Sequence, residues 1–132
     1  MFSHLKNSKL QGNVGMAYAI AFYSKLGWIV SIPMTDSQDY DLLVDNGENI
    51  LKIQVKTTTQ VDKRTGNFQV GLRTCGGNRK NYWAKTFNNN SSDFLFVVTS
   101  FKEFYSIPVK ELEGIRTSIS LCGKYDKYKV EL

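Results

Sequence analysis

A predicted β-hairpin in the first half of the chain constrains the fold more than any other segment. Two apolar runs, residues 41–45 and 50–58, flank an Asn-Gly pair, which is a strong signal for a tight turn. Side chains alternate along a strand, so Gln54 and Lys56 share one face of the second run. The turn brings Asp41 back toward that face. The hairpin therefore predicts that one carboxylate, one amide and one ammonium group converge at the edge of a cleft.

The rest of the chain supplies a helix and several further strands. A helix is expected to begin after Asn13 as its cap and to end at Gly27. Residues 74–92 form a Gly- and Asn-rich stretch that predicts a long loop. The other expected elements are strands at 28–32, 67–73 (as a third hairpin strand), 94–99 (buried on both faces) and 103–107, and a short helix at 108–112. This order predicts an α/β fold in which helices flank a mixed β-sheet.

The composition fits one domain over residues 1–132, because 42% of the residues are hydrophobic and this is enough for a core. We find no apolar run of membrane-spanning length and no hydrophobic N-terminal signal segment. Cys75 and Cys122 are far apart and have no metal-ligand spacing. We therefore expect reduced thiols and a cytoplasmic protein without a membrane partner.

Positive charge is concentrated in the middle third of the chain. The net charge is +5 overall, but residues 50–92 contain a single acid, Asp62, beside eight basic residues: Lys52, Lys56, Lys63, Arg64, Arg73, Arg79, Lys80 and Lys85. Such a segment favours phosphate-rich partners through counterion release, although a solvated charged face would have the same composition.

The long loop combines these cations with groups that suit DNA contact. Arg73, Arg79, Lys80 and Lys85, together with Lys52 on the hairpin, are predicted to contact DNA phosphates, and Asn78 or Arg79 is predicted to read bases. Aromatic residues lie between the cations. We favour the interpretation that these aromatics, Tyr82 and Trp83, anchor the loop on the core rather than stack on bases.

Carboxylate, amide and ammonium groups in one cleft are suited to phosphodiester hydrolysis. The carboxylate of Asp41 and the carbonyl oxygen of Gln54 are ligands for a divalent cation, and the ammonium of Lys56 is suited to the adjacent negative charge. The alternative is an ordinary ion pair between Asp41 and Lys56, worth about 0–1 kcal/mol. Histidine-dependent nuclease chemistry is disfavoured because His4 is the only histidine, and no phosphate-binding loop of the NTPase type is present.

The hairpin resembles the PD-(D/E)XK nuclease superfamily, in the variant where glutamine replaces the second acid. The matching residues are Asp41 and Gln54-Val55-Lys56. Further segments resemble small endonucleases of this superfamily that are related to intron-encoded homing enzymes: Gly12-Asn13-Val14-Gly15, Gly27-Trp28, Ile32-Pro33, residues 73–78, residues 94–99 and Tyr105-Ser106-Ile107-Pro108. The resemblance covers most of residues 12–112.

The resemblance implies a restriction-endonuclease-like core and a site-specific, homing-like DNA endonuclease. It implies that Asp41, Gln54 and the Val55 carbonyl bind Mg²⁺, for which Mn²⁺ can substitute, and that Lys56 orients the attacking water or stabilises the phosphorane. The expected partner is double-stranded DNA. Because one small domain has one active site and duplex cleavage needs two, we expect a homo-oligomer, either a dimer or a tetramer.

The chain departs from the superfamily pattern at one position. Relatives usually carry a glutamate on the first helix facing the metal, and the matching residue here is Met16. Asp39 is one possible substitute. Two alternative functions follow: a DNA-binding protein of the same fold with weak catalysis, and a structure-selective enzyme that resolves Holliday junctions.

Overall fold

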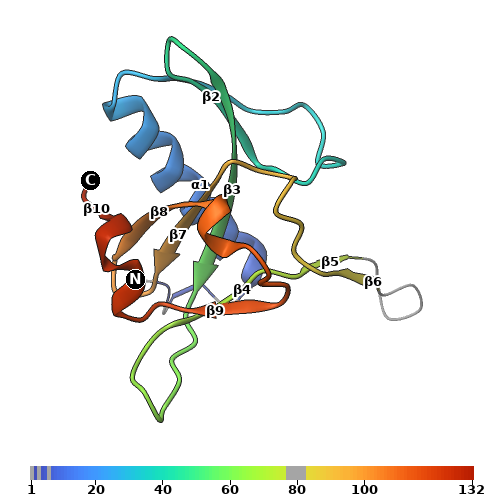
Figure 1. Ribbon diagram of the computed structural model, residues 1–132. Coiled ribbons are helices and arrows are strands. Elements are labelled where there is room, and N and C mark those ends of the chain that lie inside the picture. Colours follow the sequence, from blue (N-terminus) through green and yellow to red (C-terminus); the bar gives the residue numbers. More distant parts are fainter. Residues whose placement is uncertain (1, 3, 6, 77–82) are drawn as a thin grey trace.

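A six-stranded mixed sheet forms the centre of the computed structural model, which describes residues 2, 4, 5, 7–76 and 83–132 (Figure 1). Its strands, in spatial order, are β1 (Ile29–Ser31), β2 (Leu42–Asp45), β3 (Ile50–Thr58), β7 (Phe94–Thr99), β8 (Phe104–Pro108) and β10 (Lys129–Val130). Only β3 and β7 are parallel; the other neighbouring strands of this sheet are antiparallel. The α/β class with a mixed sheet is thus confirmed.

The predicted hairpin is confirmed as β2 and β3. Its turn depends on Gly47, whose φ of +94° lies in the left-handed region. The side-chain oxygen of Asn46 accepts hydrogen bonds from two nearby backbone N–H groups, those of Glu48 (2.9 Å) and Asn49 (2.8 Å). Pairing begins at Leu42, opposite Ile53, so the second half of β3 extends beyond β2. This overhang leaves one edge of β3 open on the side of β2.

The helix α1 (Ser8–Lys25) covers one face of the sheet and begins earlier than the sequence predicted. Asn7 is the N-cap, and its side chain accepts a hydrogen bond of 2.9 Å from the N–H of Leu10. The expected cap, Asn13, is wrong and lies inside the helix, because Asn7 caps it six residues earlier. The predicted end is correct, since Gly27 has a φ of +82° just after the last turn.

Gly15 lets α1 approach β3 closely. A Cβ built at this position would lie 2.5 Å from Cγ2 of Thr57 and 3.3 Å from Cγ1 of Val55. We therefore expect Gly15→Ala to push the helix from the sheet and to lower the free energy of unfolding by about 1–3 kcal/mol.

Gly12→Ala is the matched control for this prediction, because a Cβ at Gly12 meets nothing within 4 Å. This variant is expected to gain up to about 1 kcal/mol from helix propensity. Urea unfolding of both variants measures the difference. Equal stability of the two variants would contradict the close approach.

The core between α1 and the sheet combines aromatic and aliphatic side chains. Ala19 and Tyr23 follow Gly15 at intervals of four residues and are buried with it. The hydroxyl of Tyr23 lies 3.1 Å from Oγ of Ser106 on β8, and burial raises the pKa of Tyr23 to about 12. This phenol therefore stays protonated and joins α1 to strand β8 of the sheet.

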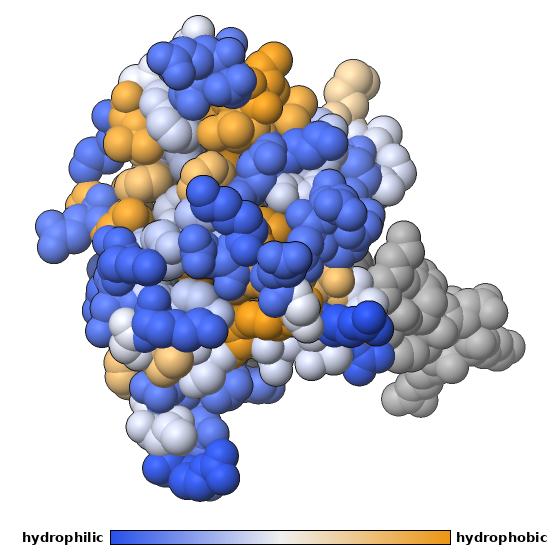
Figure 2. Space-filling model, in the orientation of Figure 1, coloured by the Kyte–Doolittle hydropathy of each residue, from blue (hydrophilic) through white to orange (hydrophobic). Residues whose placement is uncertain are grey.

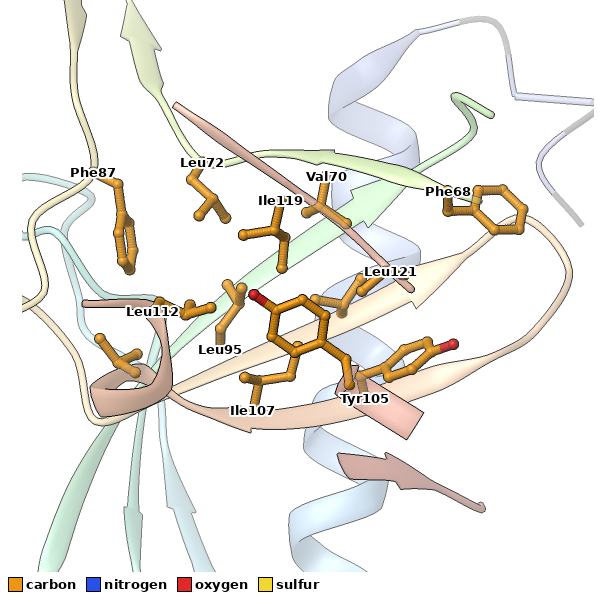
Figure 3. Close-up of a cluster of buried hydrophobic side chains, with 13 residues drawn as sticks. Phe68, Val70, Leu72, Phe87, Leu95, Tyr105, Ile107, Leu112, Ile119 and Leu121 are labelled. Atoms are coloured by element: carbon orange, nitrogen blue, oxygen red, sulfur yellow. The ribbon is translucent and has the colours of Figure 1, made fainter. Parts of the chain in front are cut away.

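A second core fills the opposite face of the sheet (Figure 3). A two-stranded sheet of β4 (Gln69–Gly71) and β9 (Ser118–Ser120) covers this face, together with two 3₁₀ helices, η1 (Val109–Leu112) and η2 (Gly123–Tyr128). The expectation that 67–73 is a third hairpin strand is wrong in its pairing, because β4 forms its ladder with β9. Side chains of β4 thereby reach the core instead of extending the central sheet.

Three further features of the structure can be compared with the predictions from the sequence. The predicted buried strand at 94–99 is confirmed, since Leu95 to Thr99 are all buried. The predicted loop at 74–92 instead contains a small antiparallel pair, β5 (Thr74–Gly76) and β6 (Trp83–Lys85). Among the described residues, no helix is long and apolar enough to cross a membrane.

Candidate functional site

Asp41 lies where β2 stops pairing with β3. Its N–H donates to the carbonyl of Ile53 (2.8 Å), and its Oδ2 accepts a hydrogen bond of 2.7 Å from the N–H of Val55. That N–H lies on the overhanging part of β3, beyond the last β2 partner. The carboxylate therefore provides the acceptor that a neighbouring strand would otherwise offer to the Val55 N–H. The carbonyl of Val55 faces the same side, because the N–H and C=O of one residue point to one edge of a strand.

The electrostatics of Asp41 combine burial with a nearby cation. Burial raises the pKa of this carboxyl above its ordinary value, although the hydrogen bond from Val55 and the positive charge of Lys56 both lower it. Dehydration dominates because water is excluded from much of the group. A partly dehydrated carboxylate gains stability when a cation approaches, so this side chain is a suitable ligand for one.

Asp41 and Lys56 line the same hollow, which has a volume of about 920 Å³ and is called the Asp41 hollow here. It lies between the first half of α1, the overhanging part of β3 and β4. Most of its other lining residues are polar: Ser8, Lys9, Gln11, Asn13, Asp36, Thr57, Thr58, Thr59, Gln60 and Gln69. Gly12, Met16, Val55 and Gly71 complete the wall. Amides, hydroxyls and two ammonium groups suit a phosphate-containing ligand.

Gln54 lines a second hollow, separate from the Asp41 hollow. Its side chain is 7% exposed, and its buried Oε1 has no hydrogen-bond partner among the described residues. This second space, of about 900 Å³, is also lined by Asp39, residues 86–91 and residues 114–116. We call it the Gln54 hollow. An unsatisfied buried carbonyl oxygen is costly, and a bound cation or water would satisfy it.

The backbone keeps the two hollows close together. Continuing the register of Leu42 with Ile53 by one residue places Asp41 opposite Gln54. The structure thus brings Asp41, Val55 and Lys56 to one hollow and directs Gln54 into its neighbour. The oxygen atoms of Asp41, of the Val55 carbonyl and of Gln54 suit a hard divalent cation such as Mg²⁺. In the described part of the chain, however, no three His, Cys, Asp or Glu side chains form a group that could hold a metal.

Two acids lie near this site, and the sequence alone could not place either. Asp36 lines the Asp41 hollow and also a smaller space of about 580 Å³ that Met16 and Asp41 share. Asp39 lines the Gln54 hollow. The sequence pointed to Asp39 as a substitute ligand and gave no signal for Asp36. Both acids belong to a polar loop without periodicity, so the sequence could not indicate which of them approaches the site. Met16 lies on the wall beside Asp41, and α1 contributes no carboxylate there.

The predicted DNA-contacting residues are only partly covered by the structure. Lys52 is exposed on β3, with its Nζ 5.5 Å from the centre of the Tyr40 ring. Arg73 is exposed after β4. Asn78, Arg79, Lys80 and the aromatic Tyr82 lie outside the described residues, and for Trp83 and Lys85 only the backbone of β6 is described.

Comparisons with known proteins agree with this fold. The profile of the PD-(D/E)XK endonuclease family matches residues 6–129. A solved structure, the bacterial homing endonuclease I-Ssp6803I, superimposes with a TM-score of 0.75 at 31% sequence identity. The alignment covers 96% of this chain and 84% of that one. No curated protein matches the sequence significantly.

Proposed function

This chain belongs to the PD-(D/E)XK endonuclease family, and we propose that it is a metal-dependent DNA endonuclease that hydrolyses phosphodiester bonds at specific sites. The observation that carries the proposal is the partly dehydrated carboxylate of Asp41, held by the Val55 N–H in a polar hollow that also contains Lys56. A partly buried carboxylate whose charged form is disfavoured by dehydration does not serve the stability of the fold. Together with Lys56, it is suited to a cation and a phosphate.

Each residue has a role that its position supports. Asp41, the Val55 carbonyl and Gln54 would hold Mg²⁺, or Mn²⁺ in its place; the unpartnered Oε1 of Gln54 is the neutral oxygen ligand. When bound, such a cation lowers the pKa of a water and polarises the phosphate. Lys56 would orient the attacking water or neutralise charge on the phosphorane. Asp41 accepts the Val55 N–H, and this hydrogen bond fixes the direction of its second oxygen.

The substrate of the proposed enzyme is double-stranded DNA. Because I-Ssp6803I is a homing endonuclease and is 31% identical over 96% of this chain, we propose homing-like recognition of a specific sequence. Lys52, Arg73 and Lys85 would contact phosphates, together with Arg79 and Lys80. Asn78 or Arg79 would read bases.

The proposed assembly follows from the number of active sites. Residues 1–132 would form one domain with one site, so that a dimer or tetramer would be required to cut both strands. We propose that this homo-oligomer acts in the cytoplasm.

Sequencing of cut ends from a genomic or randomised DNA library tests this function. Purified protein with Mg²⁺ or Mn²⁺ is expected to produce ends with shared flanking sequences, and Lys56→Ala is expected to bind the same DNA without cutting it. Normal cutting by Lys56→Ala would refute the site assignment. Ends without shared flanks, together with cleavage of branched DNA, would favour a junction-resolving enzyme.

A second candidate function is DNA binding without efficient catalysis. The observation that favours it is Met16, an apolar side chain on the wall of the Asp41 hollow, where a second acid would strengthen cation binding. Salt-dependent binding of DNA without metal-dependent cuts in the library experiment would support this function.

A further inference from the structure

The loop that connects β3 and β4 forms an ordered basic arm next to the Asp41 hollow (Figure 1). Residues 59–68 make up this arm. An isolated bridge between Val61 and Phe68 closes it, and the N–H of Asp62 donates to the carbonyl of Asn67 (2.9 Å). Gly66, with a φ of +76°, completes the reversal. The arm is thus a built hairpin with a defined tip.

The tip presents two cations to solvent. Lys63 and Arg64 are both exposed, and Figure 2 shows the tip as a hydrophilic projection at the lower end of the molecule. The backbone of the tip is ordered by its acid, because Oδ1 of Asp62 accepts a hydrogen bond of 2.8 Å from the N–H of Arg64. This Asx-type turn fixes the chain at the position of the two basic residues.

The base of the arm is fixed to the rest of the fold. The N–H of Gln69 donates to the carbonyl of Gln60 (2.8 Å), and the N–H of Ser100 donates to the carbonyl of Thr58 (3.0 Å). The ring of Phe68 packs edge-on against Phe101 at a centroid distance of 5.2 Å. These contacts anchor the base of the arm to the sheet beside the Asp41 hollow.

The arm begins within the wall of that hollow. Thr58, Thr59 and Gln60 line the hollow together with Lys56, and the chain then continues outward to the tip. Lys63 follows Lys56 by seven positions, so at most about 23 Å lies between their backbones. This length corresponds to about seven base pairs of a duplex. A duplex that places a phosphodiester in the hollow and extends about seven base pairs beyond it therefore spans the distance to the tip.

From these observations we propose that Lys63 and Arg64 form a second phosphate-binding arm that holds the DNA backbone several base pairs from the site of cleavage. The inference rests on the proposed function, since the duplex must be bound at the Asp41 hollow. It adds a contact that is separate from Lys52 and from residues 73–85. The contact is to phosphates and carries no sequence information.

The salt dependence of DNA binding tests the arm. Each neutralised phosphate contributes about 0.9 to the slope of log affinity against log salt concentration, so Lys63→Ala/Arg64→Ala is expected to lower that slope by about 1.8. The affinity is expected to fall by about 10-fold or more at 0.1 M salt. All proteins carry Lys56→Ala to prevent cutting, and the probe is a duplex of about 30 base pairs of arbitrary sequence.

The matched control removes two exposed cations that lie elsewhere, Lys25 at the end of α1 and Lys110 on η1. Lys25→Ala/Lys110→Ala is expected to leave the slope within about 0.5 of the parent. Equal slopes for the two double variants would overturn the arm while leaving the nuclease proposal intact. Failure of the parent itself to bind any duplex would overturn both. Unchanged thermal unfolding of the arm variant confirms that it is folded.

Discussion

Asp41→Asn is expected to abolish cleavage and, at the same time, to stabilise the fold at neutral pH. Loss of the only carboxylate proposed to bind the metal should lower the cleavage rate by about 10³-fold or more. The gain in stability has a separate cause. Burial raises the pKa of Asp41, so its charged form is less favourable in the folded protein than in the unfolded chain. Asparagine carries no charge and still offers an oxygen to the Val55 N–H.

The sign of the pH dependence follows from the raised pKa. A carboxyl with a raised folded-state pKa contributes its full stability below the unfolded-state value of about 4, and this contribution is lost as pH rises through the folded-state value. The stability of Asp41→Asn relative to wild type should therefore be greater at pH 7 than at pH 4. Urea unfolding at both pH values, without metal, measures this difference.

Asp45→Asn is the control, because Asp45 is an exposed carboxylate at the other end of the same strand. This variant should retain cleavage and should show no comparable gain in stability at pH 7.

Addition of Mn²⁺ should raise the unfolding temperature of wild type and of Asp45→Asn, but not that of Asp41→Asn, because a ligand that binds only the folded state stabilises it. A destabilised Asp41→Asn at pH 7 would show that the carboxylate is structural.

Local chemistry explains which parts of this fold the sequence could predict. The β2–β3 hairpin was predictable because its turn signal and its alternating apolar residues lie within one short segment. The end of α1 was predictable for the same reason, since Gly27 adopts the left-handed conformation that its position suggested. The start of α1 was not predictable, because Asn7 and Asn13 are both suitable N-cap residues. Packing against the rest of the protein, which the local sequence does not show, stabilises the additional first turns.

Long-range pairing explains what the sequence could not predict. The strand β4 reads as a continuation of the hairpin, but it pairs with β9, almost fifty residues later, since both strands bury apolar side chains against the same face of the sheet. In the candidate site, the alternation of β3 predicted one cleft for Gln54 and Lys56 together. It could not predict that segments 86–91 and 114–116 close a separate hollow around Gln54.

Met16→Glu is expected to strengthen metal binding, because it adds an acid from α1 to the wall of the Asp41 hollow. A second carboxylate near a divalent ion adds Coulomb attraction, and we expect the dissociation constant for Mn²⁺ to fall by at least about 10-fold, which corresponds to about 1.4 kcal/mol. Cleavage at limiting metal concentration should rise with it. Calorimetric titration of the protein with Mn²⁺ measures the affinity without depending on activity.

Met16→Gln is the matched control, since it has the size of the glutamate variant and lacks its charge. Both variants lose the same partly buried methionine, so the comparison isolates the carboxylate. Without metal, the introduced carboxylate would face Asp41, and two carboxylates in one hollow raise each other's pKa. The glutamate variant should therefore be less stable than the glutamine variant at pH 7 in the absence of Mn²⁺, and this difference should narrow when Mn²⁺ is added. Equal Mn²⁺ affinity of the two variants would mean that the ion binds away from α1, and would direct the search for its ligands to Asp39 in the Gln54 hollow.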